Sequence, residues 1–206
     1  MLALISAAAV ALATAAAPSI ENVPPADHIT VQVVTVNGSG CSQGTAAVAV
    51  SSDSTAFTVT YSDYLAAAGG NVRPTDFRKN CQMGLRVRVP HGFTFAIAQV
   101  DYRGFAHLAP GATGTQLAGY YFQGNSETDR LRHSFGGPFS DNWQTTDLKE
   151  VAELVFAPCG EERILNVNTE LRVNAGSSAG TTSFMAMDSA DQSIKTKYRF
   201  AWKTCF

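Results

Sequence analysis

Charge is scarce in this 206-residue chain, since Asp, Glu, Lys and Arg make up 16% of it and the formal net charge is −2. A balance so close to neutrality gives no bulk attraction to nucleic acid or to an acidic membrane surface, so we expect neither as a partner. Hydrophobic residues make up 45% of the chain. This content is enough for a buried core and is atypical of disordered chains.

Motifs that mark common enzymes and metal sites are also missing. The sequence has no P-loop and no H-E-x-x-H, and its G-S-G run at 38–40 lacks the spacing of a G-x-S-x-G nucleophile elbow. It has no C-x-x-C pair for zinc, and its four histidines are scattered. A polysaccharide-oxidising copper centre needs histidine as the first mature residue, and His28 would become terminal only after a second cut. We therefore expect no metal ion or other cofactor.

The N-terminal segment is apolar and small, although no Lys or Arg precedes the apolar run. The run that starts at Leu2 ends in Ala-Thr-Ala-Ala-Ala before Pro18, which is typical of a signal-peptidase site. We predict a signal peptide over residues 1–17, with Ala15 or Ala16 as better final residues because Pro18 is a poor first one. A membrane anchor needs about 20 apolar residues. We expect secretion to the extracellular space, without membrane attachment after cleavage.

Four cysteines are an even number, which in an exported chain indicates two disulfides. Three pairings are possible. We favour Cys41 with Cys81 and Cys159 with Cys205, because each bridge then closes a loop within one half of the chain. Loops of this size give about 3 to 4 kcal/mol of stabilisation per bridge.

Period-two hydrophobic patterns dominate the rest of the chain. In Ile164–Val173 one face carries Leu165, Val167, Thr169, Leu171 and Val173. The last strand repeats this pattern with Ile194, Thr196, Tyr198, Phe200 and Trp202. Such alternation is typical of a sheet with one buried face and one wet face, so we expect Trp202 in the core.

Shorter runs predict further strands. They are Ile29–Val36, Ala46–Val50, Ala56–Tyr61, Leu85–Val89, Phe93–Val100, Leu117–Phe122, Leu131–Phe135, Leu154–Phe156 and Thr181–Met187. Helical signals are weak and confined to Ser62–Ala68 and Asp147–Glu153. About ten strands predict an all-β, antiparallel two-sheet sandwich, either jelly-roll-like or immunoglobulin-like. We assign residues 18–28 to an N-terminal extension and 29–206 to a single β-sandwich domain.

Aromatic and basic side chains are the candidates for ligand binding. On a strand, Tyr121 faces away from the aromatic residues on either side of it, so one of the two faces is expected to be wet. Trp143 lies in a polar segment that reads as a loop, where the indole either stacks on a sugar ring or folds back as a lid on the sandwich. Arg86 and Arg88 share one strand face, which suits an anionic glycan or is simply solvated.

Carboxylates are the candidates for hydrolysis of a glycosidic bond. They are Asp101, Asp141, Asp188 and Asp191. The segment from Asp188 to Asp191 also resembles a polar turn, which either holds calcium or forms a solvated hairpin tip. Asn37 begins an N-x-S glycosylation sequon and, with the following glycine, a tight turn.

Several short motifs follow one another in an order seen in a known family. They are N-G-S-G-C with G-T (37–45), A-F-T-V (56–59), R-K-N-C-Q (78–82), D-Y-R-G (101–104), Y-F-Q-G (121–124), G-P-F (137–139), P-C-G (158–160) and W-K-T-C (202–205). In these motifs the chain resembles the secreted fungal and bacterial proteins called domain of unknown function 4360. The resemblance implies export, a single β-rich domain and the four cysteines as a framework. It implies no activity.

Three functions remain open from the sequence. The first is a non-catalytic extracellular module that binds a glycan or a cell-wall component through Tyr121, Trp143 or the face of Arg86 and Arg88. The second is a secreted hydrolase that uses carboxylates such as Asp101. The third is an effector or antimicrobial protein that acts on another organism. The oligomeric state is open as well.

Overall fold

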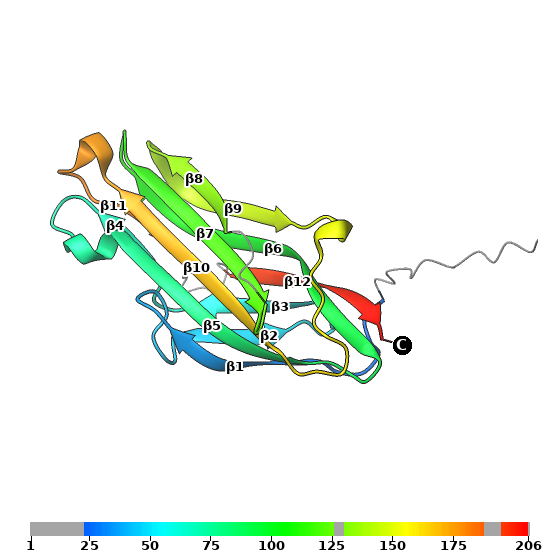
Figure 1. Ribbon diagram of the computed structural model, residues 1–206. Coiled ribbons are helices and arrows are strands. Elements are labelled where there is room, and N and C mark those ends of the chain that lie inside the picture. Colours follow the sequence, from blue (N-terminus) through cyan, green and yellow to red (C-terminus); the bar gives the residue numbers. More distant parts are fainter. Residues whose placement is uncertain (1–22, 126–129, 188–194, 206) are drawn as a thin grey trace, which may run out of the picture.

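A computed structural model describes residues 23–125, 130–187 and 195–205. The predicted signal peptide and the segment from Asp188 to Asp191 lie outside the described residues. The described residues form two antiparallel sheets packed face to face as an open sandwich. Figure 1 shows the five-stranded sheet in front of the seven-stranded one. The predicted all-β fold class is confirmed.

The five-stranded sheet has the order β1-β5-β10-β7-β8. Its strands are β1 (Thr30–Asn37), β5 (Arg78–Arg88), β10 (Ile164–Asn174), β7 (Thr113–Phe122) and β8 (Leu131–Gly136). The seven-stranded sheet has the order β2-β3-β12-β6-β11-β4, and β9 pairs with the other side of β6. Its strands are β2 (Ala46–Val50), β3 (Ala56–Tyr61), β12 (Thr196–Thr204), β6 (Phe93–Leu108), β11 (Ser183–Ala186), β4 (Leu65–Ala68) and β9 (Phe139–Leu148). Short 3-10 turns are η1 (Pro74–Phe77), η2 (Val151–Glu153) and η3 (Gly176–Ser178).

The core lies between the sheets and follows the predicted alternation. Every inward position of β10 is buried, from Leu165 to Val173, and Trp202 on β12 is only 1% exposed. Aromatic rings fill the centre, where Phe57 stacks on Tyr198 with ring centroids 4.7 Å apart. Burial of these side chains is the main source of stability in a sandwich of this kind.

Disulfides join Cys41 to Cys81 and Cys159 to Cys205, which is the pairing favoured from the sequence. The first ties the segment after β1 to the first half of β5. The second ties the loop before β10 to the residue that follows β12.

Two local predictions are wrong, and a third is only partly right. Residues 65–68 form strand β4 instead of a helical turn, because Ala66 and Ala67 are buried and pair with β11. Of the second helical candidate, only Val151–Glu153 is helical, as the 3-10 turn η2. Leu154–Phe156 forms no strand. These failures share a cause, since tertiary pairing decides between strand and turn in short runs with little periodicity.

Candidate functional site

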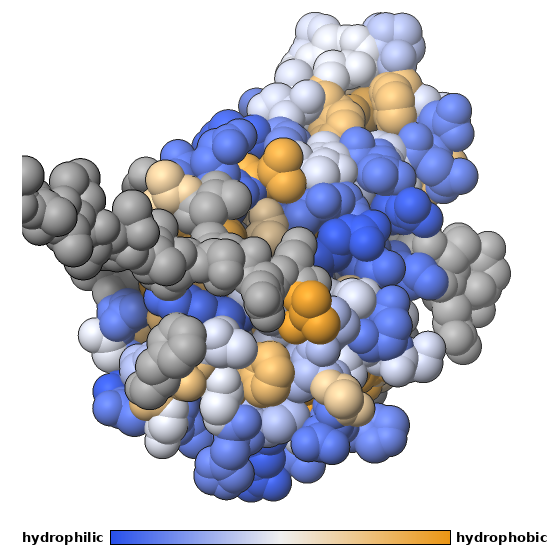
Figure 2. Space-filling model, turned by 90° about the vertical axis from the view of Figure 1, so that its right-hand side faces the viewer, coloured by the Kyte–Doolittle hydropathy of each residue, from blue (hydrophilic) through white to orange (hydrophobic). Residues whose placement is uncertain are grey.

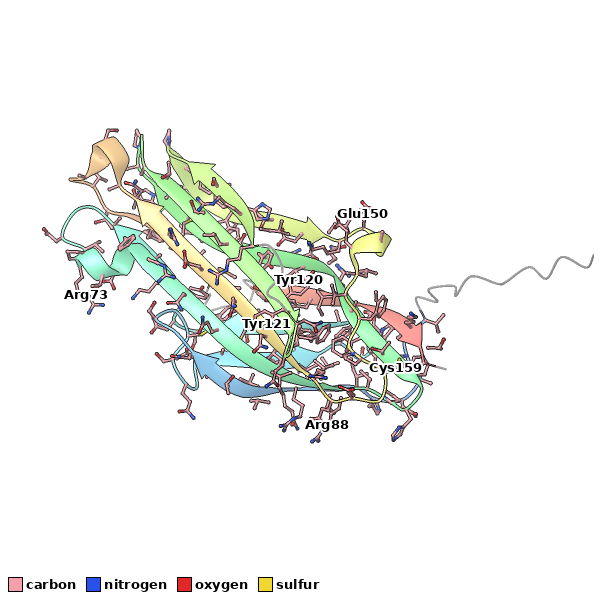
Figure 3. All side chains as sticks on the ribbon, viewed as in Figure 1. Arg73, Arg88, Tyr120, Tyr121, Glu150 and Cys159 are labelled. Carbon is pink, nitrogen blue, oxygen red and sulfur yellow. A yellow bond between two sulfur atoms is a disulfide. The ribbon has the colours of Figure 1, made fainter. Side chains whose placement is uncertain are left out.

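Tyr121 lies near the end of β7, on the outer face of the five-stranded sheet. In the register of β7 with β10, Phe122 is opposite the buried Leu165, and Tyr121 is opposite Asn166. Side chains alternate along a strand, so Tyr120 and Phe122 point between the sheets and Tyr121 points outward. Figure 3 shows Tyr120 and Tyr121 at this end of β7.

A hollow of about 190 Å³ lies beside Tyr121. Its lining consists of Ile97, Tyr120, Tyr121, Phe122, Asn125, Lys149, Glu153 and Val155. The pairing of β7 with β8 ends where Ala118 meets Leu131, so the hollow runs along the stretch of β7 beyond that pairing. Ile97 and Phe122 are buried and give the hollow an apolar base, whereas Glu153 and Asn125 are exposed at its rim.

Tyr120 gives the hollow a neutral polar group. Burial raises the pKa of its phenol to about 12, and the nearby negative charges of Asp147 and Glu153 add to this effect. The phenol is therefore protonated at any physiological pH. Its hydroxyl donates a hydrogen bond to the Ile97 carbonyl at 3.3 Å, which anchors β7 to β6 across the sandwich.

Arg86 and Arg88 lie on the same outer face and are both close to one carboxylate. Glu162 Oε1 is 2.5 Å from Arg86 Nε, and Oε2 is 3.7 Å from Arg88 Nε. The pair of arginines therefore presents one surplus positive charge instead of two. This reduces the positive charge available to an anionic glycan, which is one of the two alternatives that the sequence left open for this face.

The arginines and Tyr121 belong to one continuous surface. Arg86 pairs with Ile164 and Tyr121 pairs with Asn166, so β10 separates the two side chains. Strand spacing and rise put their Cα atoms about 12 Å apart. A second hollow, of about 300 Å³, begins at Arg88 and extends to the loop that carries Cys159. In Figure 3, Arg88 lies at the lower margin of the sheet and Cys159 at its right-hand end.

Trp143 takes no part in this surface. It lies on β9, not in a loop, and is only 4% exposed. It pairs with Gly104 of β6, where a Cβ atom would lie 2.3 Å from the indole. The glycine thus leaves the space that the indole fills, and the ring of Phe135 packs 5.4 Å away. Of the two alternatives that the sequence left open for Trp143, the exposed, sugar-stacking indole is wrong. The indole packs into the core, which is closer to the alternative in which it folds back onto the sandwich.

The structure does not bring Asp101 and Asp141 together. Asp101 is opposite Thr146 of β9, and Asp141 is five residues further along that strand. The rise of a strand then separates them by about 17 Å, and the odd spacing points them to opposite faces. Glycosidases need carboxyl groups within about 10 Å. Asp101 instead lies 3.3 Å from the Arg199 guanidinium.

Among the described residues, no three His, Cys, Asp or Glu side chains gather around a possible metal site. In the same part of the chain, no helix has the length and apolar character needed to cross a membrane. Asn37 is exposed at the end of β1. Its sequon is therefore accessible, and its glycosylation stays a prediction.

Residues 27–205 match the profile of the family described as "Domain of unknown function (DUF4360)". The chain belongs to this family. A relative from the fungus Arthroderma benhamiae, named "Uncharacterized secreted protein", supports the assignment. It is 33% identical over 184 residues, which cover 89% of this chain and 75% of the relative.

One solved structure compared with this DUF4360 chain is the enzymatically active domain of tailspike protein 4 from bacteriophage CBA120. The identity is 10% and the TM-score is 0.26. The alignment covers 91% of this chain and only 21% of the tailspike chain. A score this low carries no argument about fold or function.

Sequence reasoning found Tyr121 in this DUF4360 chain and missed the rest of the hollow. Lys149 and Glu153 follow β9, a strand that the sequence did not reveal. Tyr120 was identified only as a neighbour whose side chain faces the other way. The one signal available was the run of three aromatic residues at 120–122, which marks a place where both faces of a strand carry rings.

Proposed function

We propose that this chain is a secreted, non-catalytic module that binds a nearly neutral glycan in the hollow beside Tyr121. The observation that carries the proposal is the composition of the hollow, which combines an apolar base, a polar rim and, at its margin, the outward ring of Tyr121. A sugar ring has matching parts, since its C–H face packs on an aromatic ring and its hydroxyl groups form hydrogen bonds at the edge.

The charges around the hollow favour a neutral ligand. Lys149 and Glu153 carry opposite formal charges, and the Tyr120 phenol stays protonated. Glu162 compensates one of the two adjacent arginine charges. A polyanion such as a uronic-acid polymer would find little net attraction here.

Secretion is supported by two independent features. The Arthroderma benhamiae relative is named as a secreted protein. The two disulfides are typical of proteins that fold in an oxidising compartment.

The proposal is tested by co-sedimentation of the oxidised protein with insoluble chitin, β-1,3-glucan and cellulose. We expect retention on at least one of them, and about tenfold weaker binding for Tyr121→Ala because the stacked ring is lost. Tyr121→Phe keeps the ring and should bind as the wild type does. Phe77→Ala removes an aromatic ring that is 48% exposed in η1 and serves as the matched control. Equal retention of Tyr121→Ala and the wild type would contradict the proposal.

A further inference from the structure

We infer that the outer face of the seven-stranded sheet carries a second glycan-binding surface, formed by the rings of Phe105, His107 and Phe184. We call these three side chains the ring platform. The inference deepens the proposed function and rests on it for the class of ligand.

The register places the three rings on one face. Phe105 and His107 are two residues apart on β6, and both point away from the core because the buried Ala106 between them points inward. Phe184 of β11 is opposite His107. All three side chains keep partial exposure.

The rings lie side by side and are only moderately tilted. The centroid of Phe184 is 5.9 Å from that of Phe105, with 30° between the ring planes. It is 5.8 Å from that of His107, with 32° between the planes. Centroids 5.8 and 5.9 Å apart are too close for rings that lie edge to edge in one plane, so the three rings form a stepped row in which each is offset from its neighbour. Each ring then offers solvent a part of its face or edge, on which the C–H face of a pyranose packs.

A polar row borders the ring platform on the side of β9. Ser140, Asn142 and Gln144 are opposite His107, Phe105 and Arg103 respectively, and all three are exposed. The Ser140 hydroxyl lies 3.1 Å from Nδ1 of His107, which holds the imidazole in place. Hydroxyl and amide groups both donate and accept hydrogen bonds, as sugar hydroxyls do.

The ring platform and the polar row beside it favour a glycan chain as the ligand of this surface. A second copy of the chain would require a broad apolar patch at the centre of the contact, and here exposed polar residues lie directly beside three rings. An extended glycan needs only a narrow surface that offers rings on one side and hydrogen-bonding groups on the other. The chemistry of the two rows fits a neutral glycan chain.

The two surfaces face in opposite directions. Tyr121 points outward from the five-stranded sheet, and the ring platform points outward from the seven-stranded sheet. Figure 1 shows the second sheet behind the first. One molecule would therefore hold two glycan chains at once and cross-link a polymer network.

Titration calorimetry with the hexasaccharides of N-acetylglucosamine and of β-1,3-glucose tests this inference. We expect two sites per molecule in the wild type, and one remaining site in Phe184→Ala, with the other weakened by about tenfold or more. Asn142→Ala alters an exposed side chain and should weaken the same site without affecting folding. An unchanged thermal midpoint of Asn142→Ala confirms that the loss is one of binding.

The outcomes separate the two proposals. Two sites in the wild type, with one lost in Phe184→Ala and the other in Tyr121→Ala, support both. A single site that is lost in Tyr121→Ala and retained in Phe184→Ala and Asn142→Ala overturns the ring platform alone. A single site that is lost in Phe184→Ala and retained in Tyr121→Ala supports the platform and overturns the hollow. Absence of binding to either hexasaccharide overturns the ring platform.

Discussion

The pair formed by His133 and Asp147 spans the edge where the two sheets meet. His133 is on β8 in the five-stranded sheet, and Asp147 is on β9 in the seven-stranded sheet. The distance from Nε2 of His133 to Oδ1 of Asp147 is 2.7 Å. Asp147 is only 5% exposed. We predict that this contact stabilises the closure of the sandwich at the β8–β9 edge.

The expected magnitude follows from burial. A hydrogen bond to a charged group contributes about 1.5 to 3 kcal/mol, and removal of one partner of a fully buried pair costs about 3 to 5 kcal/mol. The His133 side chain is 28% exposed, so water screens part of the interaction. We expect His133→Ala to lower the free energy of unfolding by about 3 kcal/mol. For a chain of this size the melting temperature then falls by about 6 to 12 °C.

A double-mutant cycle separates the pair from its surroundings. Urea unfolding of His133→Ala, Asp147→Asn and the double variant should give a coupling free energy of about 2 kcal/mol. His91→Ala is the matched control, because His91 is exposed at the turn between β5 and β6. It should change the free energy of unfolding by less than about 0.5 kcal/mol. A coupling free energy no larger than that of the control would refute the reasoning.

Two further predictions concern stability. Burial alone raises the pKa of Glu170, but hydrogen bonds and charges from Arg172 and Arg78 outweigh it and hold the pKa below its ordinary value. This stabilisation is complete above the pKa of the unfolded chain and disappears as pH falls through the folded-state pKa. Glu170→Gln should therefore destabilise by about 2 kcal/mol at pH 7, and urea titrations should show this difference shrinking steadily as the pH is lowered into the acidic range. Replacement of Cys159 and Cys205 by serine opens a loop of 46 residues and should cost about 4 kcal/mol, measured from urea midpoints; an unchanged midpoint would contradict this.

Strands with one buried face were predictable because their residues alternate without interruption. In β10 each inward position is buried, and even the polar Thr169 fits this pattern, since its hydroxyl bonds to Tyr64 inside the core at 3.1 Å. The same logic gave β12 and the burial of Trp202. Local alternation does not depend on which strand lies beside it, and it can therefore be recognised in a single sequence.

Strand β9 was not predictable for the opposite reason. Its inward positions include Thr145 and Asp147, and its outward positions are polar except for the exposed Leu148. Alternation between hydrophobic and polar residues is consequently weak, although the backbone pairs with β6 over ten positions. Only the tertiary structure explains why a carboxylate can be buried at Asp147, because His133 on the other sheet forms a hydrogen bond with it. Because β9 was not predicted, Trp143 was expected in a loop, although it lies on this strand and is buried.

The hollow beside Tyr121 shows the same limit at the level of function. Alternation predicts that Tyr120 and Tyr121 face opposite ways. It does not show that, among the described residues, the pairing of β7 with β8 ends at Ala118, before the strand reaches the two tyrosines. The charged rim comes from residues after β9, whose position depends on the pairing of β9 with β6. A binding surface that is assembled from two sheets has no local sequence pattern, so the sequence indicated only its outward tyrosine, Tyr121.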